Sequence, residues 1–248
     1  MDTTNNQTQP VENLLVQRAK AADKSDVADE FYIDAIAAAA MAITHPVLVL
    51  KFAPQHLSTA WLTDEAAARP KIALEYAAQF LSAESLALAA KAEPMPALRY
   101  AAKHLSAESL AAAAIAEPSY ALEFSAQHLS GESLAAAAKR NPWHALSYAA
   151  QYLSDESLAE AAKAWPDVAI LHAAQYLSAK SLAKAALEEP RLAIQYAAQY
   201  LSAESLAAAA TAKPRAALDL AREHLTPELL EQVQAALVPP KKPKLPGM

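Results

Sequence analysis

Apolar and polar positions along this chain recur with a period of 24 residues, and each period starts at a proline. The eight starting residues are Pro46, Pro70, Pro94, Pro118, Pro142, Pro166, Pro190 and Pro214. Aligned on them, the units share the pattern P-x-x-A-L-x-Y-A-A-Q-x-L-S-x-E-S-L-A-x-A-A-x-A-x, whose positions we number from the proline. Eight units in one register establish a tandem repeat.

Each unit predicts two short helices. Proline suits the first turn of a helix, and the apolar positions 4, 5, 8, 9 and 12 have helical spacing, so the first half predicts one helix, named helix A. Serine or threonine at position 13 is a favourable N-cap, and glutamate at position 15 complements the helix dipole. The second helix, helix B, is expected to run until the next proline stops it.

Hairpins this small bury their apolar faces only against their neighbours. The predicted fold is therefore all-α, a right-handed α-solenoid of eight 24-residue helix-turn-helix repeats over residues 46–237. Residues 11–45 predict diverged N-terminal capping helices and residues 1–10 a polar, disordered N-terminus. Residues 238–248 are rich in proline and lysine and predict a non-helical basic tail.

Three structural expectations follow from particular positions. Positions 12 and 17 are leucine in all eight units, so these two columns are expected to dominate stability. Helix A carries leucine and aromatic residues whereas helix B carries mostly alanine, so the helix B row is expected to be the shorter, concave side. Pro54 falls inside the first helix A and predicts a kink there.

Composition narrows the function classes. The 248 residues include 66 alanines, which favour helix, and no cysteine, which excludes disulfides, thiolate zinc sites and iron–sulfur ligation. A net charge of −6 opposes broad attraction to nucleic acid or anionic lipid. No apolar stretch is long enough for a membrane span, and no signal peptide is visible. The expected location is cytoplasmic, or outside the cell after export without a cleavable signal peptide.

Two tryptophans break the repeat pattern. Trp143 and Trp165 occupy positions 2 and 24, which are expected to face solvent, and exposed tryptophans are typical binding anchors. Tyr120, His144 and Arg140 would complete a binding hot spot around them. Shielding of the adjacent prolines is the alternative interpretation.

Two periodic stripes offer further candidates. Glutamates at position 15, on the expected concave side, could receive a basic peptide, or could simply complement the helix dipole; the candidates are Glu84, Glu108, Glu132 and Glu156. Positions 7 and 11 hold mostly aromatic residues and histidine on one helical face. That stripe is either a ligand-stacking surface or part of the packing between repeats.

The sequence contains no catalytic motif and no convincing set of metal ligands. His104 and His128 are the best metal pair, yet equivalent positions of adjacent units lie about 8–10 Å apart, a full helix spacing. The serines are repeated caps, and no glycine-rich loop is present. We therefore expect no enzyme activity, no metal and no cofactor.

The unit A-L-x-Y-A-A-Q-x-L-S-x-E-S-L-A-x-A-A resembles a bacterial family of unknown function built from tandem short helical repeats. The likeness covers about residues 46–237 and implies a helical repeat fold, but no substrate, cofactor or site. The unit also resembles, loosely, the hairpins of transcription-activator-like effectors, although it is ten residues shorter and lacks their base-reading glycine loop.

The units vary least at the leucine and alanine columns and most at positions 2, 3, 6, 19, 22 and 24. This distribution favours a non-enzymatic scaffold that presents an extended repeat surface to a partner protein or peptide, with self-association as a variant. An engineered or consensus-like repeat protein without a natural partner and a nucleic-acid-binding repeat protein are the alternatives. Export as a bacterial effector would suit the first interpretation.

Overall fold

The computed structural model describes residues 35–237, and every element in that range is helical. The expected N-terminus 1–10, most of the capping segment 11–45 and the tail 238–248 lie outside the described residues. The all-α prediction is confirmed for the described part. No helix in this part is long and apolar enough to cross a lipid bilayer. Contacts divide the chain into an N-terminal unit ending at Ser130 and a C-terminal unit beginning at Gly131.

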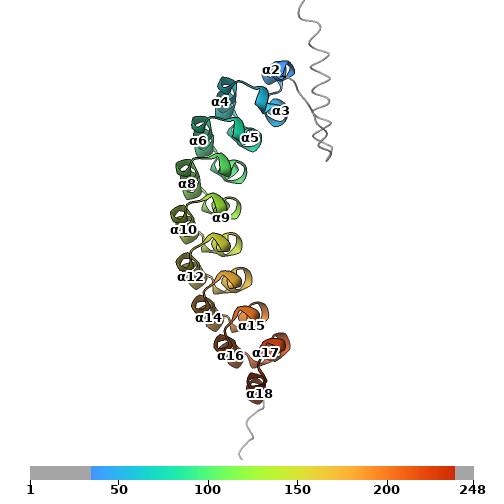
Figure 1. Ribbon diagram of the computed structural model, residues 1–248, viewed down its shortest axis with the longest axis vertical. Helices are drawn as coiled ribbons and strands as arrows, with labels where there is room; N and C mark the ends of the chain where they lie inside the picture. The colour runs from blue at the N-terminus through green and yellow to red at the C-terminus, as the bar shows by residue number, and fades with distance from the viewer. Residues whose placement is uncertain (1–34, 238–248) are drawn as a thin grey trace, which may run out of the picture. The chain divides into compact units, whose positions relative to one another are not determined.

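From Pro46 on, helices in both units begin in alternation at a repeat proline and just after a repeat serine or threonine. Figure 1 shows the two kinds of helix alternating along each unit. The N-terminal unit contains α2 (Ala35–Thr44), α3 (Pro46–Phe52), α4 (Thr59–Ala68), α5 (Pro70–Tyr76), α6 (Ala83–Ala92), α7 (Pro94–Pro96), α8 (Ala107–Ala116) and α9 (Pro118–Phe124). The C-terminal unit contains α10 (Gly131–Arg140), α11 (Pro142–His144), α12 (Asp155–Ala164), α13 (Pro166–Val168), α14 (Ala179–Glu188), α15 (Pro190–Tyr196), α16 (Ala203–Ala212), α17 (Pro214–Leu220) and α18 (Pro227–Ala236).

Helix A is broken in every repeat at position 8. Ala77 has φ −123° and ψ 7°, outside helical values, and a 3₁₀ turn follows at Ala78–Phe80 (η2). The break expected from Pro54 is present, with Ala53 at φ −145°, but Ala77 shows that the break does not require proline. In three repeats a short first turn (α7, α11 or α13) is followed directly by a π-helical turn. The π-helical turn after α7 is η3, Ala97–Ala101.

The serine at position 13 caps helix B as predicted. In α6, the N–H of Ser85 donates to Oγ of Ser82 at 3.1 Å, and in α18 the N–H of Leu229 donates to the hydroxyl oxygen of Thr226 at 3.3 Å. Sequence reasoning missed the serine at position 16. Its hydroxyl lies 2.8 Å from the capping hydroxyl in the Ser82–Ser85 pair, so the repeated motif S-x-E-S acts as a paired cap.

Replacing a capping serine is expected to give a small, specific loss of stability. Ser106→Ala removes the acceptor for the N–H of Ser109 and should lower the free energy of unfolding by about 1 kcal/mol. Ser106→Asp keeps a capping oxygen and should stay within about 0.5 kcal/mol of the wild type. Urea unfolding followed by circular dichroism measures both, and equal losses would show that the cap contributes nothing.

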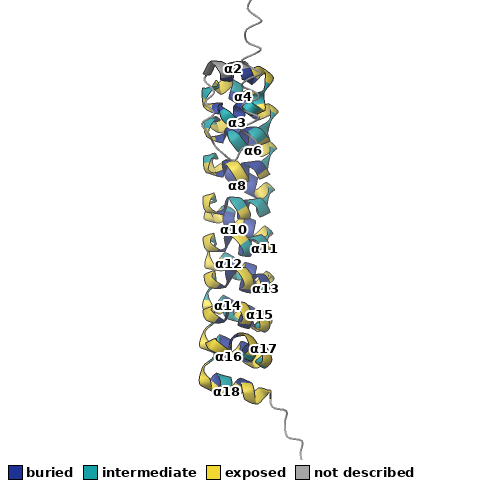
Figure 2. Cartoon of the chain, turned by 90° about the vertical axis from the view of Figure 1, so that its right-hand side faces the viewer, coloured by how far each residue is buried: buried dark blue, intermediate teal, exposed yellow. Residues whose placement is uncertain are grey.

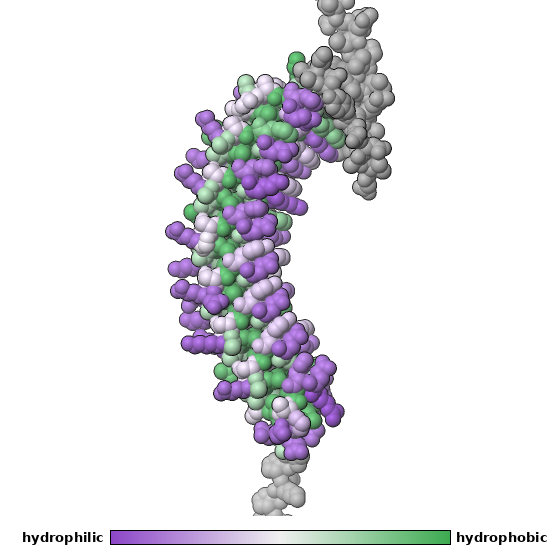
Figure 3. All heavy atoms as spheres, in the orientation of Figure 1, coloured by the Kyte–Doolittle hydropathy of each residue, from purple (hydrophilic) through white to green (hydrophobic). Residues whose placement is uncertain are grey.

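The core of each unit is built from positions 4, 5, 8 and 9 of helix A and positions 17, 20 and 21 of helix B. Leu74, Leu98 and Leu146 at position 5 are fully buried, and Leu134 at position 17 is 4% exposed. Position 12 is mostly half-buried, as at Leu153, so the expectation of two dominant leucine columns holds only for position 17. Position 5 takes the place of position 12. Figure 2 shows buried residues within every hairpin, and Figure 3 shows apolar residues between two hydrophilic margins of each unit.

The expected concave position of helix B is wrong. In the C-terminal unit α12 packs on α10 and α14, while α17 packs on α15, so the two helix types form two rows. Figure 1 shows the helix B row on the outer side of the bend within each unit. The reason is that helix A also packs through alanine: Ala193 and Ala197 at positions 4 and 8 are fully buried. In the C-terminal unit its tyrosines are exposed and do not hold neighbouring helices apart.

Candidate functional site: an exposed tyrosine ladder

The stripe at positions 7 and 11 is open to solvent in the C-terminal unit. Helix A buries positions 4, 5, 8 and 9, so positions 7 and 11 project from its free face. Five tyrosines there, which we name the tyrosine ladder, are exposed by 37–50%: Tyr148, Tyr152, Tyr176, Tyr196 and Tyr200. The π-turns η6 (Ala145–Ala149) and η8 (Ala169–Ala173) pack on each other, and η8 packs on α15, so successive rungs are neighbours.

In the N-terminal unit, a cation lies over each aromatic ring at position 7 of the same stripe. Nζ of Lys51 lies 5.3 Å from the ring centre of Phe52 and 5.5 Å from that of Tyr76. The guanidinium carbon of Arg99 lies 5.3 Å from the ring centre of Tyr100 and 5.1 Å from that of Phe124. Three of these four rings are half-buried, so in this unit the stripe takes part in packing between repeats.

The cations over these rings come from position 6. Lys51 and Arg99 occupy position 6 in two repeats of the N-terminal unit. In the described part of the C-terminal unit, position 6 carries no cation and is occupied by Ser147, Leu171, Gln195 and Asp219. The ring faces of the tyrosine ladder are therefore not covered by a lysine or arginine from that position.

Polar groups accompany the exposed rings. Nε2 of Gln195 donates to Oη of Tyr196 at 3.1 Å. Position 10 is glutamine in each of the three repeats that carry the ladder, and Gln151, Gln175 and Gln199 are all exposed. The ladder therefore offers aromatic faces for stacking together with hydroxyl and amide groups that can donate to carbonyl oxygens.

Trp143 and His144, predicted as parts of a hot spot, adjoin the first rung of the ladder. The ring centre of His144 lies 4.9 Å from Trp143 and 5.6 Å from Tyr148, and the Trp143–Tyr148 distance is 6.1 Å. Oδ1 of Asn141 accepts the N–H of His144 at 3.2 Å and lies 3.1 Å from its Nδ1, which orients the imidazole. Trp143 is 37% exposed, so its indole is accessible.

Trp165 and Tyr120, two other predicted hot-spot residues, are not part of this cluster. Trp165 directly precedes α13 and is 44% exposed, and within the described residues no aromatic ring stacks on it. Arg140 ends α10 and is exposed. Tyr120 belongs to the N-terminal unit, where its half-buried ring stacks on Phe124 at 5.9 Å.

The glutamates at position 15 have the location that the helix dipole favours. Glu84, Glu108, Glu132 and Glu156 are exposed in the first turns of α6, α8, α10 and α12. Because helix B forms the outer row of each unit, the hypothesis of an acidic ladder on a concave side is wrong. Their positions fit the structural explanation that they stabilise helix N-termini.

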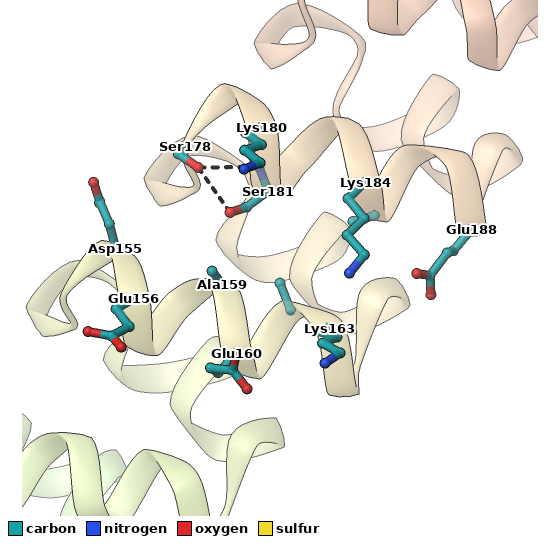
Figure 4. A pocket seen from close by; sticks show the side chains of 12 residues that line it. Asp155, Glu156, Ala159, Glu160, Lys163, Ser178, Lys180, Ser181, Lys184 and Glu188 are labelled. Atoms are coloured by element: carbon teal, nitrogen blue, oxygen red, sulfur yellow. Dashed lines mark hydrogen bonds between the residues drawn. The ribbon is translucent and has the colours of Figure 1, made fainter.

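A groove of mixed charge lies between α12 and α14. Figure 4 shows Glu156 and Glu160 on the α12 side and Lys180 and Lys184 on the α14 side. Equivalent positions of the two helices thus carry opposite charges, at positions 15 and 19. This pairing of opposite charges favours the packing of α12 against α14. It gives the groove no preference for an anionic or a cationic ligand.

Two ionisable groups in the N-terminal unit are perturbed. A hydrogen bond to Glu75 and, next, burial raise the pKa of Tyr76 above its ordinary value. Burial and, next, the charge of Lys103 lower the pKa of His104. Both shifts favour the uncharged form at neutral pH.

Among the described residues, no three histidine or acidic side chains lie close enough together to hold a metal ion. Comparison of the chain with protein-family models, with curated proteins and with solved structures returned no match. Membership of the bacterial short-repeat family therefore stays a prediction.

Proposed function

We propose that this chain is a non-enzymatic binding scaffold, a right-handed α-solenoid of eight repeats, whose tyrosine ladder holds a segment of a partner protein or peptide. The observation that carries the proposal is the set of five exposed tyrosines at equivalent positions of neighbouring helices. Tyrosine supplies a large, rigid contact area with a polar tip, which is why it is enriched at binding hot spots. Trp143 extends the same aromatic surface at its N-terminal end.

Charge favours a peptide over a nucleic acid on this surface. Proteins that stack bases on aromatic rungs combine them with a positively charged groove that follows the phosphates. Position 6 beside the ladder supplies no such cation in the described C-terminal unit, and Asp219 is acidic. The net charge of the whole chain, −6, acts in the same direction.

Selection from a random library tests the proposal without assuming which partner binds. Displayed random peptides would be selected on the full-length chain, and the affinities of the enriched peptides measured by fluorescence anisotropy. Tyr176→Ala/Tyr200→Ala should weaken them at least about tenfold, the size expected for loss of hot-spot side chains. Tyr100→Ala is the control outside the ladder: its side chain is 38% exposed, about as much as that of Tyr176, but it lies in the N-terminal unit under the guanidinium of Arg99, and its loss should leave the affinities unchanged.

Peptides that bind the Tyr176→Ala/Tyr200→Ala variant as tightly as the wild type would show that the ladder is not the site. The variant Trp143→Ala/Trp165→Ala then tests whether the tryptophans alone form it. Circular dichroism of every variant confirms that the helices are retained.

A further inference from the structure

Three tyrosines of the ladder form a regular column. Tyr152, Tyr176 and Tyr200 occupy position 11 of three consecutive repeats and are exposed to nearly the same extent, 37–42%. The first helices of these repeats pack directly on one another, η6 on η8 and η8 on α15, and each repeat has a fully buried alanine at position 8. Helices in such contact lie about 8–10 Å apart, so successive tyrosines of the column are separated by about that distance.

This separation matches one peptide conformation. A β-strand presents residues on the same face about 6.6 Å apart, and an α-helix advances about 5.4 Å in one turn and about 10.8 Å in two. A polyproline II helix repeats every three residues and rises about 9.3 Å per turn, which lies within the range. A peptide with proline at every third residue therefore places one proline on each tyrosine of the column, and aromatic surfaces are the usual receptors for such segments.

The polar groups of the same repeats also suit this peptide. Polyproline II has no internal hydrogen bonds, so its carbonyl oxygens are free to accept. The tyrosine hydroxyl groups and the exposed amides of Gln151, Gln175 and Gln199 supply donors. Positions 6, 7, 10 and 11 of the three repeats carry no lysine, arginine, aspartate or glutamate. The column therefore favours an uncharged stretch of peptide, since a charge covered there would find no partner.

Acidic residues follow the column in the next repeat. Asp219 at position 6 and Glu223 at position 10 are both exposed, and α17 of this repeat packs on α15. Arg222 lies at position 9, on the face that the other repeats bury. One further turn of polyproline II beyond Tyr200 reaches this repeat, so a lysine or arginine of the peptide would meet the opposite charge there.

We infer that the tyrosine column binds an uncharged polyproline II segment of a partner protein. Prolines at every third residue lie on Tyr152, Tyr176 and Tyr200, and a basic residue one turn further lies at Asp219 and Glu223. This inference rests on the proposed function, since it takes the ladder as a peptide site and adds the class of peptide.

Synthetic peptides test the inference on the full-length chain. Fluorescein-labelled PAQPAQPAQK and its reversed sequence KQAPQAPQAP, which place lysine at either end, are titrated and followed by fluorescence anisotropy. At least one should bind, and Tyr176→Ala/Tyr200→Ala should weaken that binding at least about tenfold, whereas Tyr100→Ala should leave it unchanged. A peptide of the same composition with its prolines out of the three-residue spacing, such as PPAQAPQAQK, should bind at least about fivefold more weakly, because only one of its prolines can face the column.

Replacing the lysine of the peptide tests the acidic end separately. Glutamine in its place should weaken binding about two- to fivefold, the size typical of an exposed ion pair. Asp219→Asn/Glu223→Gln should remove this difference, and circular dichroism confirms that the variants keep their helices.

Four results would overturn the inference. The first two are that neither peptide binds, and that binding is undiminished when Tyr176 and Tyr200 are replaced. The third is equal binding of peptides with prolines in and out of the spacing. The fourth is a preference for lysine that is absent, or that persists in Asp219→Asn/Glu223→Gln.

Two further observations separate this inference from the proposed function. Library peptides that lack the proline spacing but still require Tyr176 and Tyr200 would keep the proposed function and overturn the inference. Tyrosine-dependent binding of cellohexaose in place of any peptide would assign the column to a neutral glycan and overturn both.

Discussion

Leu146→Ala is expected to lower the free energy of unfolding of the C-terminal unit by about 2–5 kcal/mol, the range for large-to-small changes at fully buried leucines. Leu146 has no exposed surface and packs in one cluster with Leu158, Val168 and Ala169. Removing its isobutyl group loses the buried apolar contacts and leaves a cavity, because rigid neighbouring helices cannot collapse fully into the space.

Leu153→Ala is the matched control for this substitution. Leu153 belongs to a column that is leucine in every repeat, but it is only half-buried and lies at the edge of the same cluster. Its loss should therefore be about half that of Leu146→Ala or less, since less apolar area leaves water. Urea unfolding of both variants, followed by far-ultraviolet circular dichroism, ranks them, and a larger loss for Leu153 would contradict the assignment of the core.

Ala197→Leu should destabilise the chain by about 1–3 kcal/mol through overpacking. Position 8 is alanine in seven repeats and serine in the other, and Ala197 is fully buried against Ile170, Leu182 and Ala193. Three additional carbon atoms there must push α15 away from its neighbour. Because helix A lines the inner side of the bend, this displacement should also change the curvature of the unit.

Ala208→Leu separates overpacking from the intrinsic effect of leucine. Ala208 lies on the exposed face of α16 at position 19, where Leu88 already stands in another repeat. Both substitutions replace alanine with leucine within a helical repeat, but only Ala197→Leu meets a packed neighbour. Thermal unfolding should shift clearly for Ala197→Leu and little for Ala208→Leu, and equal shifts would show that position 8 is not tightly packed.

Much of the local structure can be predicted because single residues carry strong signals. Pro70 and its equivalents begin helix A, and Ser82 and its equivalents cap helix B, since proline and serine each fit one end of a helix for a specific backbone reason. The burial of Leu134 at position 17 also follows from helical spacing.

The break in helix A and the direction of bending cannot be predicted in the same way. Ala77 and Ala197 both leave helical geometry, yet alanine is the best helix former, so nothing local indicates the break. The prediction of the bend is wrong because it places the aromatic residues of helix A between repeats. Tyr148 and Tyr196 instead project into solvent.

The candidate site is only partly visible in the sequence. Helical spacing identifies the stripe at positions 7 and 11, but whether a cation lies over a ring depends on position 6, which varies from Lys51 and Arg99 to Ser147 and Gln195. Whether a cation folds back over a ring depends on side-chain geometry that periodicity does not contain. Lysine and arginine at position 6 of the N-terminal half are the sequence signal for rings that lie under a cation.

Each hairpin contacts only the adjacent hairpins within its unit, and this affects how the number of repeats can change in evolution. Every hairpin begins at the same proline and meets the next through the same kinds of residues, as α12 meets α14 and α14 meets α16. Recombination between the near-identical gene segments can delete or duplicate one whole hairpin while each remaining contact keeps a partner of the same kind. The number of exposed tyrosine rungs is thus inherited as a copy number.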